Sequence, residues 1–267
     1  LVFADSLERA LDYGPFDVAL FALKSYDTES ALAGIKPFVE KMPPVLCLQN
    51  GVDNEPAIAK ILGSENVIAG TVTSAIGRRD AGDIALEKLR GIGIADVHPL
   101  SRRLVTAMNE ALLNAKLYPR AADMKWSKML TNLVGNATSA ILDMSPAELF
   151  ARDDLYAFEM RMLREALAVM DAQDIRVVDL PGTPVRLLGF AAKGPKWLRP
   201  LAAKKLGGGR GGKMPSLHID LHSGRGKSEV EYLNGAVQRA GKEGKTSTLV
   251  NQLLNETLLS MASGKIA

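Results

Sequence analysis

The sequence is poor in cysteine, in excess charge and in long apolar runs, and each shortage excludes a class of protein. Its single cysteine, Cys47, rules out a disulfide within the chain, and the apolar run 44–48 indicates a buried thiol. The net charge of +3 is too small to favour nucleic acid as a partner. No apolar run approaches the roughly 20 residues of a membrane span, and no signal peptide is visible. We therefore expect a soluble, cytoplasmic protein without a membrane or nucleic-acid partner.

The N-terminal half alternates apolar segments of strand length with segments of helical periodicity. We predict strands at 16–23, 45–48 and 66–73, helices at about 28–39 and 54–62, a β-hairpin region at 77–96, and a helix at 101–114 before a short strand. Strands that are apolar throughout indicate a parallel sheet covered on both faces. Such sheets bind ligands beyond the carboxyl ends of their strands, where Lys24 and Asn50 fall. Taken alone, Lys24 is more typical of an exposed surface lysine, and Asn50-Gly51 of an ordinary turn.

After Pro119 only helical periodicity recurs. We predict helices at about 123–141, 145–150, 153–173, 184–192, 228–240 and 246–263. The change of pattern predicts a boundary near residue 120, with an α/β domain at 1–120 and an all-α domain at 121–267. The last two helices have apolar residues at helical spacing, which favours a role in the core, and a homodimer contact is the alternative.

Lys128, Asn132 and Asn136 recur at a four-residue spacing, which would place them on one stripe of the predicted helix 123–141. Asparagine is a poor helix former, so two of them inside one helix need a reason. Lys125, Gly135 and Ser139 fall near the same stripe, and the opposite half is apolar (Trp126, Met129, Leu130, Leu133, Val134, Ile141). A solvated helix face is one interpretation. Short amides beside a lysine favour the other, a face pressed against a small polar molecule.

A resemblance covers nearly the whole chain and rests on motifs that occur in a fixed order. They are Lys24-x-x-Asp27 after a strand, Leu48-Gln49-Asn50-Gly51-Val52, Lys128-x-x-x-Asn132-x-x-x-Asn136, Ser216-x-x-x-Asp220 with Gly224-Arg225, Ser228-Glu229-Val230-Glu231-Tyr232-Leu233-Asn234-Gly235, and Gly241-Lys242-Glu243-Gly244-Lys245-Thr246. In this order they resemble the ketopantoate reductase (2-dehydropantoate 2-reductase) family. The resemblance implies a partial Rossmann-like domain in 1–120 and a helical catalytic domain in 121–267.

The resemblance also implies an activity and a role for each motif residue. The enzyme would pass hydride from NADPH to the ketone of a small 2-keto acid, giving pantoate in pantothenate biosynthesis. Lys128 would be the general acid, and Glu229 would bind the substrate hydroxyl and help to position Lys128. Substrate-binding residues would be Asn132, Asn136, Ser216 and Asn50, and those near the cofactor Lys24, Asn50 and Glu229. The resemblance implies no metal site.

Two departures qualify the resemblance. The glycine-rich turn, strand–G-x-G-x-x-G–helix, is missing ahead of the strand at 16–23, so we expect a partial sequence that binds NADPH weakly or not at all. Gly244-Lys245-Thr246 is no substitute, because the first glycine of a phosphate-binding loop would fall on Arg239. The segment 182–215 is long and basic between 193 and 213, which favours a flexible solvated connection over a lid for an anionic ligand.

Three functions remain open from the sequence. The first is the NADPH-dependent reductase, although the residue that distinguishes NADP from NAD would lie in the absent segment. The second is a non-catalytic remnant, which retention of both Lys128 and Glu229 argues against. The third is a reductase of the same family that acts on another keto acid.

Overall fold

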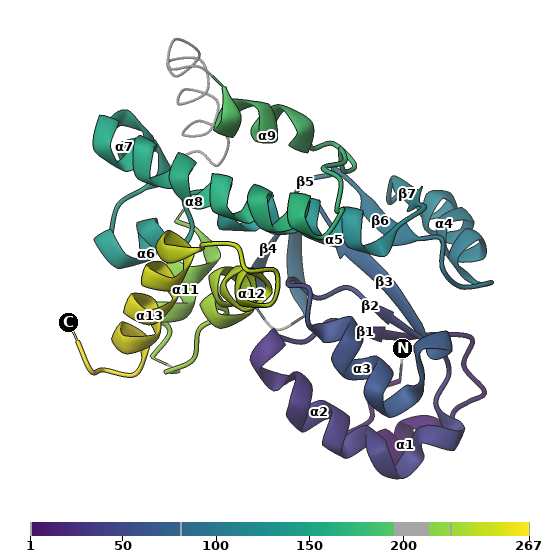
Figure 1. The fold of residues 1–267 in the computed structure, drawn as a ribbon. Helices are drawn as coiled ribbons and strands as arrows, with labels where there is room; N and C mark the ends of the chain where they lie inside the picture. The colour runs from purple at the N-terminus through teal and green to yellow at the C-terminus, as the bar shows by residue number, and fades with distance from the viewer. Residues whose placement is uncertain (1, 81, 195–213, 225, 267) are drawn as a thin grey trace. The chain divides into compact units, whose positions relative to one another are not determined.

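The computed structural model describes residues 2–80, 82–194, 214–224 and 226–266, and the chain divides into two compact units (Figure 1). The first comprises Leu1–Lys125 with Leu180–Thr183, and the second comprises Trp126–Asp179 with Pro184–Ala267. The basic residues expected at 196–213 lie outside the described part of the chain. The domain limits proposed from the sequence stay predictions.

The first unit contains a five-stranded sheet in the order β1-β2-β3-β6-β7. Its strands are β1 Ala19–Phe21, β2 Val45–Cys47, β3 Val67–Val72, β6 Ile92–Ala95 and β7 Ala115–Tyr118. Parallel pairing joins β1 to β2, β2 to β3 and β6 to β7, whereas β3 and β6 pair antiparallel. The mainly parallel Rossmann-like sheet is therefore confirmed, with one antiparallel pair that the sequence did not predict.

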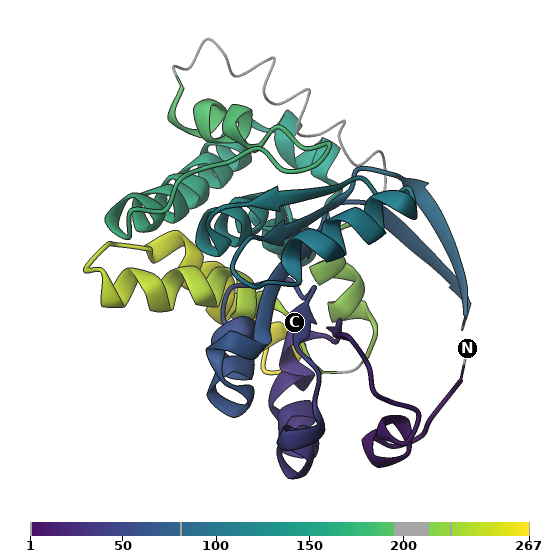
Figure 2. The ribbon, with the colours of Figure 1, turned by 90° about the vertical axis from the view of Figure 1, so that its right-hand side faces the viewer.

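The hairpin prediction for 77–96 is wrong at its C-terminal end. Strands β4 Ala75–Asp80 and β5 Asp83–Lys88 pair as a two-stranded sheet, which extends away from the main sheet (Figure 2). The chain then returns to the main sheet as β6. Its four residues are all buried, so they serve the core of the first unit and not the hairpin.

Helices cover both faces of this sheet because alternate residues of its strands point to opposite sides. Val45 and Cys47 of β2 belong to one apolar cluster, together with side chains of α2 Thr28–Ile35 and α3 Asn54–Leu62. Leu46 belongs to the other cluster, against which α4 Ser101–Glu110 packs. The remaining short helices of this unit are α1 Leu7–Leu11, η1 Ser25–Asp27, η2 Lys36–Lys41 and η3 Ser64–Asn66.

The second unit contains only helices within the part of the chain that the structure describes. They are α5 Ala121–Leu133, which begins in the first unit, α6 Ala137–Leu142, α7 Pro146–Ala151, α8 Asp153–Ala172, α9 Val185–Lys193, α11 Ser216–His222, α12 Val230–Glu243 and α13 Leu249–Ala262. The helical character predicted for this half is confirmed. The short helix α11 was not predicted.

The prediction of one continuous helix over 123–141 is wrong, because the chain breaks between α5 and α6. Gly135 has a φ of 58°, a conformation that glycine adopts without strain. A Cβ at this position would lie 3.2 Å from the Phe150 ring, so space as well as conformation favours glycine. The buried carboxylate of Glu159 accepts hydrogen bonds from the Gly135 N–H, at 2.8 Å, and from the Thr138 hydroxyl. These hydrogen bonds stabilise the interruption between α5 and α6.

Close packing of α12 against α13 explains part of the motif at 228–235 without reference to a ligand. Asn234 Nδ2 donates to Asn251 Oδ1 at 3.1 Å, and both side chains are buried. A Cβ on Gly235 would lie 3.1 Å from the side-chain amide of Asn255, so glycine permits the close approach. Across the described residues, no helix is both long and apolar enough to cross a membrane.

Candidate functional site

In the first unit, the predicted residues Lys24 and Asn50 follow neighbouring parallel strands at the same edge of the sheet. Lys24 is half-buried after β1, and Asn50 is exposed after β2. The Ser25 hydroxyl donates to the Asn50 carbonyl at 3.1 Å, and Gln49 Nε2 donates to the Leu23 carbonyl at 2.9 Å. The structure therefore brings the two loops together, as strand-end geometry predicts.

A network of buried polar side chains makes hydrogen bonds to these loops, and the sequence analysis did not predict it. Asn54 Nδ2 donates to the Asn50 carbonyl at 2.7 Å and to Ser25 Oγ at 3.1 Å. Thr28 Oγ1 donates to Asn54 Oδ1 at 2.9 Å and accepts from Gln49 Nε2 at 3.0 Å. Buried, mutually satisfied amides and hydroxyls restrict a backbone to one arrangement. These hydrogen bonds therefore hold the loops that carry Lys24 and Asn50.

Lys125, which the helical stripe grouped with Lys128, instead belongs to the interior of the first unit. Its side chain is only 5% exposed, and Nζ lies 2.6 Å from Glu55 Oε1 in a buried ion pair. Nζ also donates to the carbonyls of Gln49, at 2.7 Å, and Gly70, at 3.3 Å. Lys125 therefore links the loop after β2 to strand β3. We assign it a structural role.

Cys47 lies beside this ion pair. Burial, and next the negative charge of Glu55, raise the pKa of its thiol to about 12 from an ordinary 9.0. The thiol is fully buried and contacts Gln49 Oε1 at 3.6 Å. The thiolate is the reactive form of cysteine, so this pKa makes Cys47 an inert core residue.

In the second unit, Lys128 and Asn132 lie on α5, and both side chains are half-buried. The opposite face of the helix is in the core, as predicted, with Trp126, Met129, Leu130 and Leu133 all buried. Asn136 is not on the same helix, because it is the residue that precedes α6. Its Nδ2 nevertheless donates to the Asn132 carbonyl at 2.8 Å, which keeps the two asparagines adjacent.

The structure also brings Ser216 to Asn136, from 80 residues away. Asn136 Oδ1 accepts from the Leu217 N–H at 3.0 Å, and Asn136 Nδ2 lies 3.4 Å from Ser216 Oγ. Ser216 is the first residue of α11 and is exposed. Asn136 therefore fixes the start of α11 and presents the serine hydroxyl at the surface. Residue spacing alone could not reveal this contact.

Glu229 precedes the first residue of α12, where it is 6% exposed. The positive end of the helix dipole favours a carboxylate at this position. The neighbouring hydroxyl of Ser228, also buried, accepts from the Val230 N–H at 3.2 Å. The structure thus places a buried acid and a half-buried lysine in the second unit. That their charged groups face one another stays a prediction.

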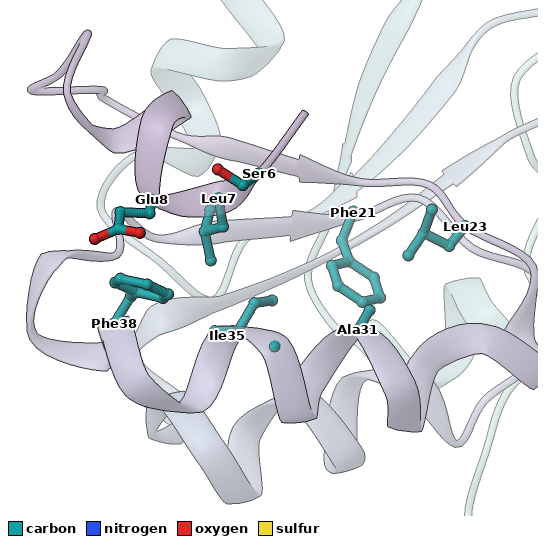
Figure 3. A pocket seen from close by; sticks show the side chains of 9 residues that line it. Ser6, Leu7, Glu8, Phe21, Leu23, Ala31, Ile35 and Phe38 are labelled. Atoms are coloured by element: carbon teal, nitrogen blue, oxygen red, sulfur yellow. The ribbon is translucent and has the colours of Figure 1, made fainter. Parts of the chain in front are cut away.

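A pocket of about 480 Å³ in the first unit is not this site. Residues in or next to α1, β1, α2 and η2 line it, and most of them are apolar (Figure 3). Ser6 and Glu8 are its polar members, and neither Lys24 nor Asn50 lines it. Among the described residues, no Lys, Arg or His lines it that could pair with the carboxylate of a keto acid.

The mainly parallel sheet with polar strand ends, and the helical unit that carries Lys128, Asn132 and Asn136, match the two-domain plan of Rossmann-like oxidoreductases. The profile described as "Ketopantoate reductase PanE/ApbA" matches residues 3–99, and its "C terminal" counterpart matches residues 120–262. The chain therefore belongs to the ketopantoate reductase family.

Individual relatives are distant. A 2-dehydropantoate 2-reductase of Streptococcus pyogenes serotype M3 is 25% identical over 85% of this chain and 70% of its own length. The structure of a PanE/ApbA family ketopantoate reductase from Ralstonia eutropha JMP134 has a TM-score of 0.78 and 23% identity, covering 96% and 78% of the two chains. D-mandelate dehydrogenase with NADH and anilino(oxo)acetate has a TM-score of 0.75 and 21% identity, covering 94% and 77%. These two structures establish the fold.

Proposed function

We propose that the protein reduces the ketone of a 2-keto acid with hydride from NADPH, and that 2-dehydropantoate, which becomes pantoate in pantothenate biosynthesis, is the substrate. One observation gives this proposal its strongest support. The second unit gathers Asn132, Asn136 and Ser216, three uncharged polar residues from two separate motifs, at the end of the helix that bears Lys128. Such residues bind a carboxylate and hydroxyls without adding a charge next to the lysine.

Lys128 is proposed as the general acid. A nicotinamide held near Lys24 and Asn50 would supply the hydride to the carbonyl carbon and would itself be oxidised to NADP⁺, while the π electrons of the carbonyl move to its oxygen. The oxygen takes a proton from the Lys128 ammonium, so the product is the neutral 2-hydroxyl, and the lysine regains its proton from solvent. An ammonium at this oxygen stabilises charge that develops mainly in the transition state.

Glu229 is proposed to accept a hydrogen bond from the substrate hydroxyl and to orient Lys128. Its position at the start of α12 suits this role, because a carboxylate there is stabilised by the helix and is held by a rigid backbone. Asn132, Asn136 and Ser216 then donate to the carboxylate and hydroxyls of the substrate.

The nicotinamide is proposed to bind near Lys24 and Asn50. The fit rests on the exposed amide of Asn50 and on the polar network that holds its backbone. Loops with a fixed backbone at this edge of the sheet can position the flat, polar nicotinamide ring. The experiments below use the full-length protein.

Lys128→Ala tests the proposal. We expect turnover to fall by roughly a hundredfold or more, the usual contribution of a general acid. Lys242→Ala is the matched control, because Lys242 is an exposed helical lysine in the same unit. Circular dichroism confirms that both variants fold. A fall of less than tenfold in Lys128→Ala would remove this lysine as the acid.

A reductase for another keto acid is the second candidate. It is favoured by the similar fold of D-mandelate dehydrogenase, whose structure contains NADH and anilino(oxo)acetate. Comparing kcat/KM for 2-dehydropantoate and for aryl keto acids, each with NADPH and with NADH, decides between substrates and cofactors. Absence of nicotinamide binding by the full-length protein would favour the non-catalytic remnant. The cytoplasmic location and the homodimer stay predictions, and sedimentation tests the second.

A further inference from the structure

Outside the proposed site, three side chains with metal-binding atoms converge on the second unit. Asp143 ends α6, and His218 and His222 lie one turn apart on α11. One ligand atom from each side chain lies within 4.8 Å of the others. The chain has only three histidines, so two of them meet here.

A hydrogen bond to a backbone carbonyl determines which ring nitrogen of His222 is available to a metal. Its Nδ1 lies 2.9 Å from the carbonyl oxygen of His218, which can only accept, so Nδ1 carries the proton. The neutral ring must then have its lone pair on Nε2. Metal-binding histidines in proteins are commonly oriented in this way, with the second nitrogen donating to a carbonyl or carboxylate.

His218 and Asp143 are already in contact. His218 Nε2 lies 2.7 Å from Asp143 Oδ1, and the side chains are 15% and 77% exposed. Asp143 has a φ of 50°, the left-handed conformation that aspartate tolerates at a helix end. The rings of His218 and His222 stack with their centres 4.0 Å apart. The helix end and the stacked rings restrict how far these ligands can move apart.

We propose that Asp143, His218 and His222 form a binding site for a divalent transition metal of the Zn²⁺ class. Two imidazoles and one carboxylate match the ligands that Zn²⁺ prefers, whereas Mg²⁺ and Ca²⁺ favour oxygen ligands alone. Zn²⁺ holds such ligands at about 2.0–2.2 Å, so small side-chain rotations would close the cluster around the ion. The exposed carboxylate leaves the fourth position for water.

The cluster lies on the two helices that begin at the proposed substrate site, with Asp143 at the end of α6, His218 in the first turn of α11 and His222 at its last residue. Asn136 precedes α6, Ser216 begins α11, and these two residues are joined by the contacts described above. A metal bound to Asp143 and to both histidines would join the same two helices a second time. This consequence rests on the proposed function. The metal site itself does not.

The test measures Zn²⁺ binding directly, by isothermal titration of the complete, untagged protein with zinc chloride. We expect one saturable equivalent, at least tenfold weaker binding in His218→Ala and in His222→Ala, and no comparable binding of Mg²⁺. His98→Ala is the control, because it removes the only histidine outside the cluster. Asp143→Asn removes the charge but keeps a residue that tolerates the left-handed conformation, so it should also weaken binding.

Two results would overturn the site: no saturable binding at equimolar Zn²⁺, or equal binding by the wild type and His222→Ala. Measurements of turnover distinguish the metal site from the proposed reductase site. Lys128→Ala should lose activity and still bind Zn²⁺, whereas His222→Ala should lose Zn²⁺ and keep its basal reduction. If Zn²⁺ stiffens the start of α11, it should change KM for the keto acid in the wild type and leave KM of His222→Ala unchanged.

Discussion

Replacing Lys125 with methionine should destabilise the protein more than any surface charge change. The methionine preserves most of the side-chain volume, but Glu55 loses its cation and two backbone carbonyls lose a donor. Glu55 Oε1 is buried, and Lys125 Nζ at 2.6 Å is the contact that compensates its charge. Breaking a buried pair from one side typically costs about 3–5 kcal/mol, because an uncompensated charge remains. We expect a loss near the lower end, since the Glu55 side chain is 14% exposed.

Urea denaturation of Lys125→Met, Glu55→Gln and the double variant measures this effect. The double variant should be more stable than the sum of the single changes predicts, by about 1 kcal/mol or more, because it removes both charges together. Arg152→Met with Asp154→Asn is the matched control, since this ion pair is exposed and should show no coupling. A destabilisation below about 1 kcal/mol for Lys125→Met, with no coupling to Glu55, would refute a structural role for the pair.

Three further changes test other parts of the structure. Glu165 accepts hydrogen bonds from the backbone N–H groups of Val250 and Asn251 at the start of α13. Glu165→Ala should therefore lower the free energy of unfolding, measured in urea, by about 2 kcal/mol. Glu165→Gln keeps an acceptor and should lose less stability. Gly135→Ala should lose about 1–2 kcal/mol, since it forces a positive φ on alanine, and an unchanged denaturation midpoint would contradict the described break. Cys47 should resist iodoacetamide at pH 8.5 until urea unfolds the protein, because folding raises its pKa from 9.0 to about 12; rapid labelling of the folded protein would show that the thiol is accessible. Since the unfolded thiol ionises first, the contribution of Cys47 to stability should be lost as the pH rises from about 9 to 12.

Periodicity predicted most elements because most of them have one buried face or are buried throughout. It failed where a single residue or a distant partner decides the outcome. The break at Gly135 leaves the apolar pattern intact, and its cause includes Glu159, a residue two helices away. Helix α11 has seven residues, about two turns, too few to establish a period. Strand β6 resembles any short apolar strand, and only its pairing with β3 distinguishes it from part of a hairpin.

The candidate site was predicted in part for the same reason. Lys24 and Asn50 could be placed at one edge because the ends of parallel strands meet there whatever the sequence of the loops. The residues that hold those loops could not be identified, because Thr28 and Asn54 lie on different helices and meet only in three dimensions. The contact of Asn136 with Ser216 depends on the fold in the same way.

Lys125 and Lys128 show most clearly what a stripe of polar residues can and cannot establish. They have the same side chain, lie three residues apart on α5 and are separated by about 60° around the helix axis. Their environments nevertheless differ, because Lys125 meets Glu55 and two carbonyls in the core of the first unit, whereas Lys128 is half-buried on the second. A buried ammonium that is already bonded three times has no free position from which to protonate a substrate. The choice of Lys128 as the general acid therefore gains support from the contacts of its neighbour, which remove Lys125 as the competing candidate on that helix.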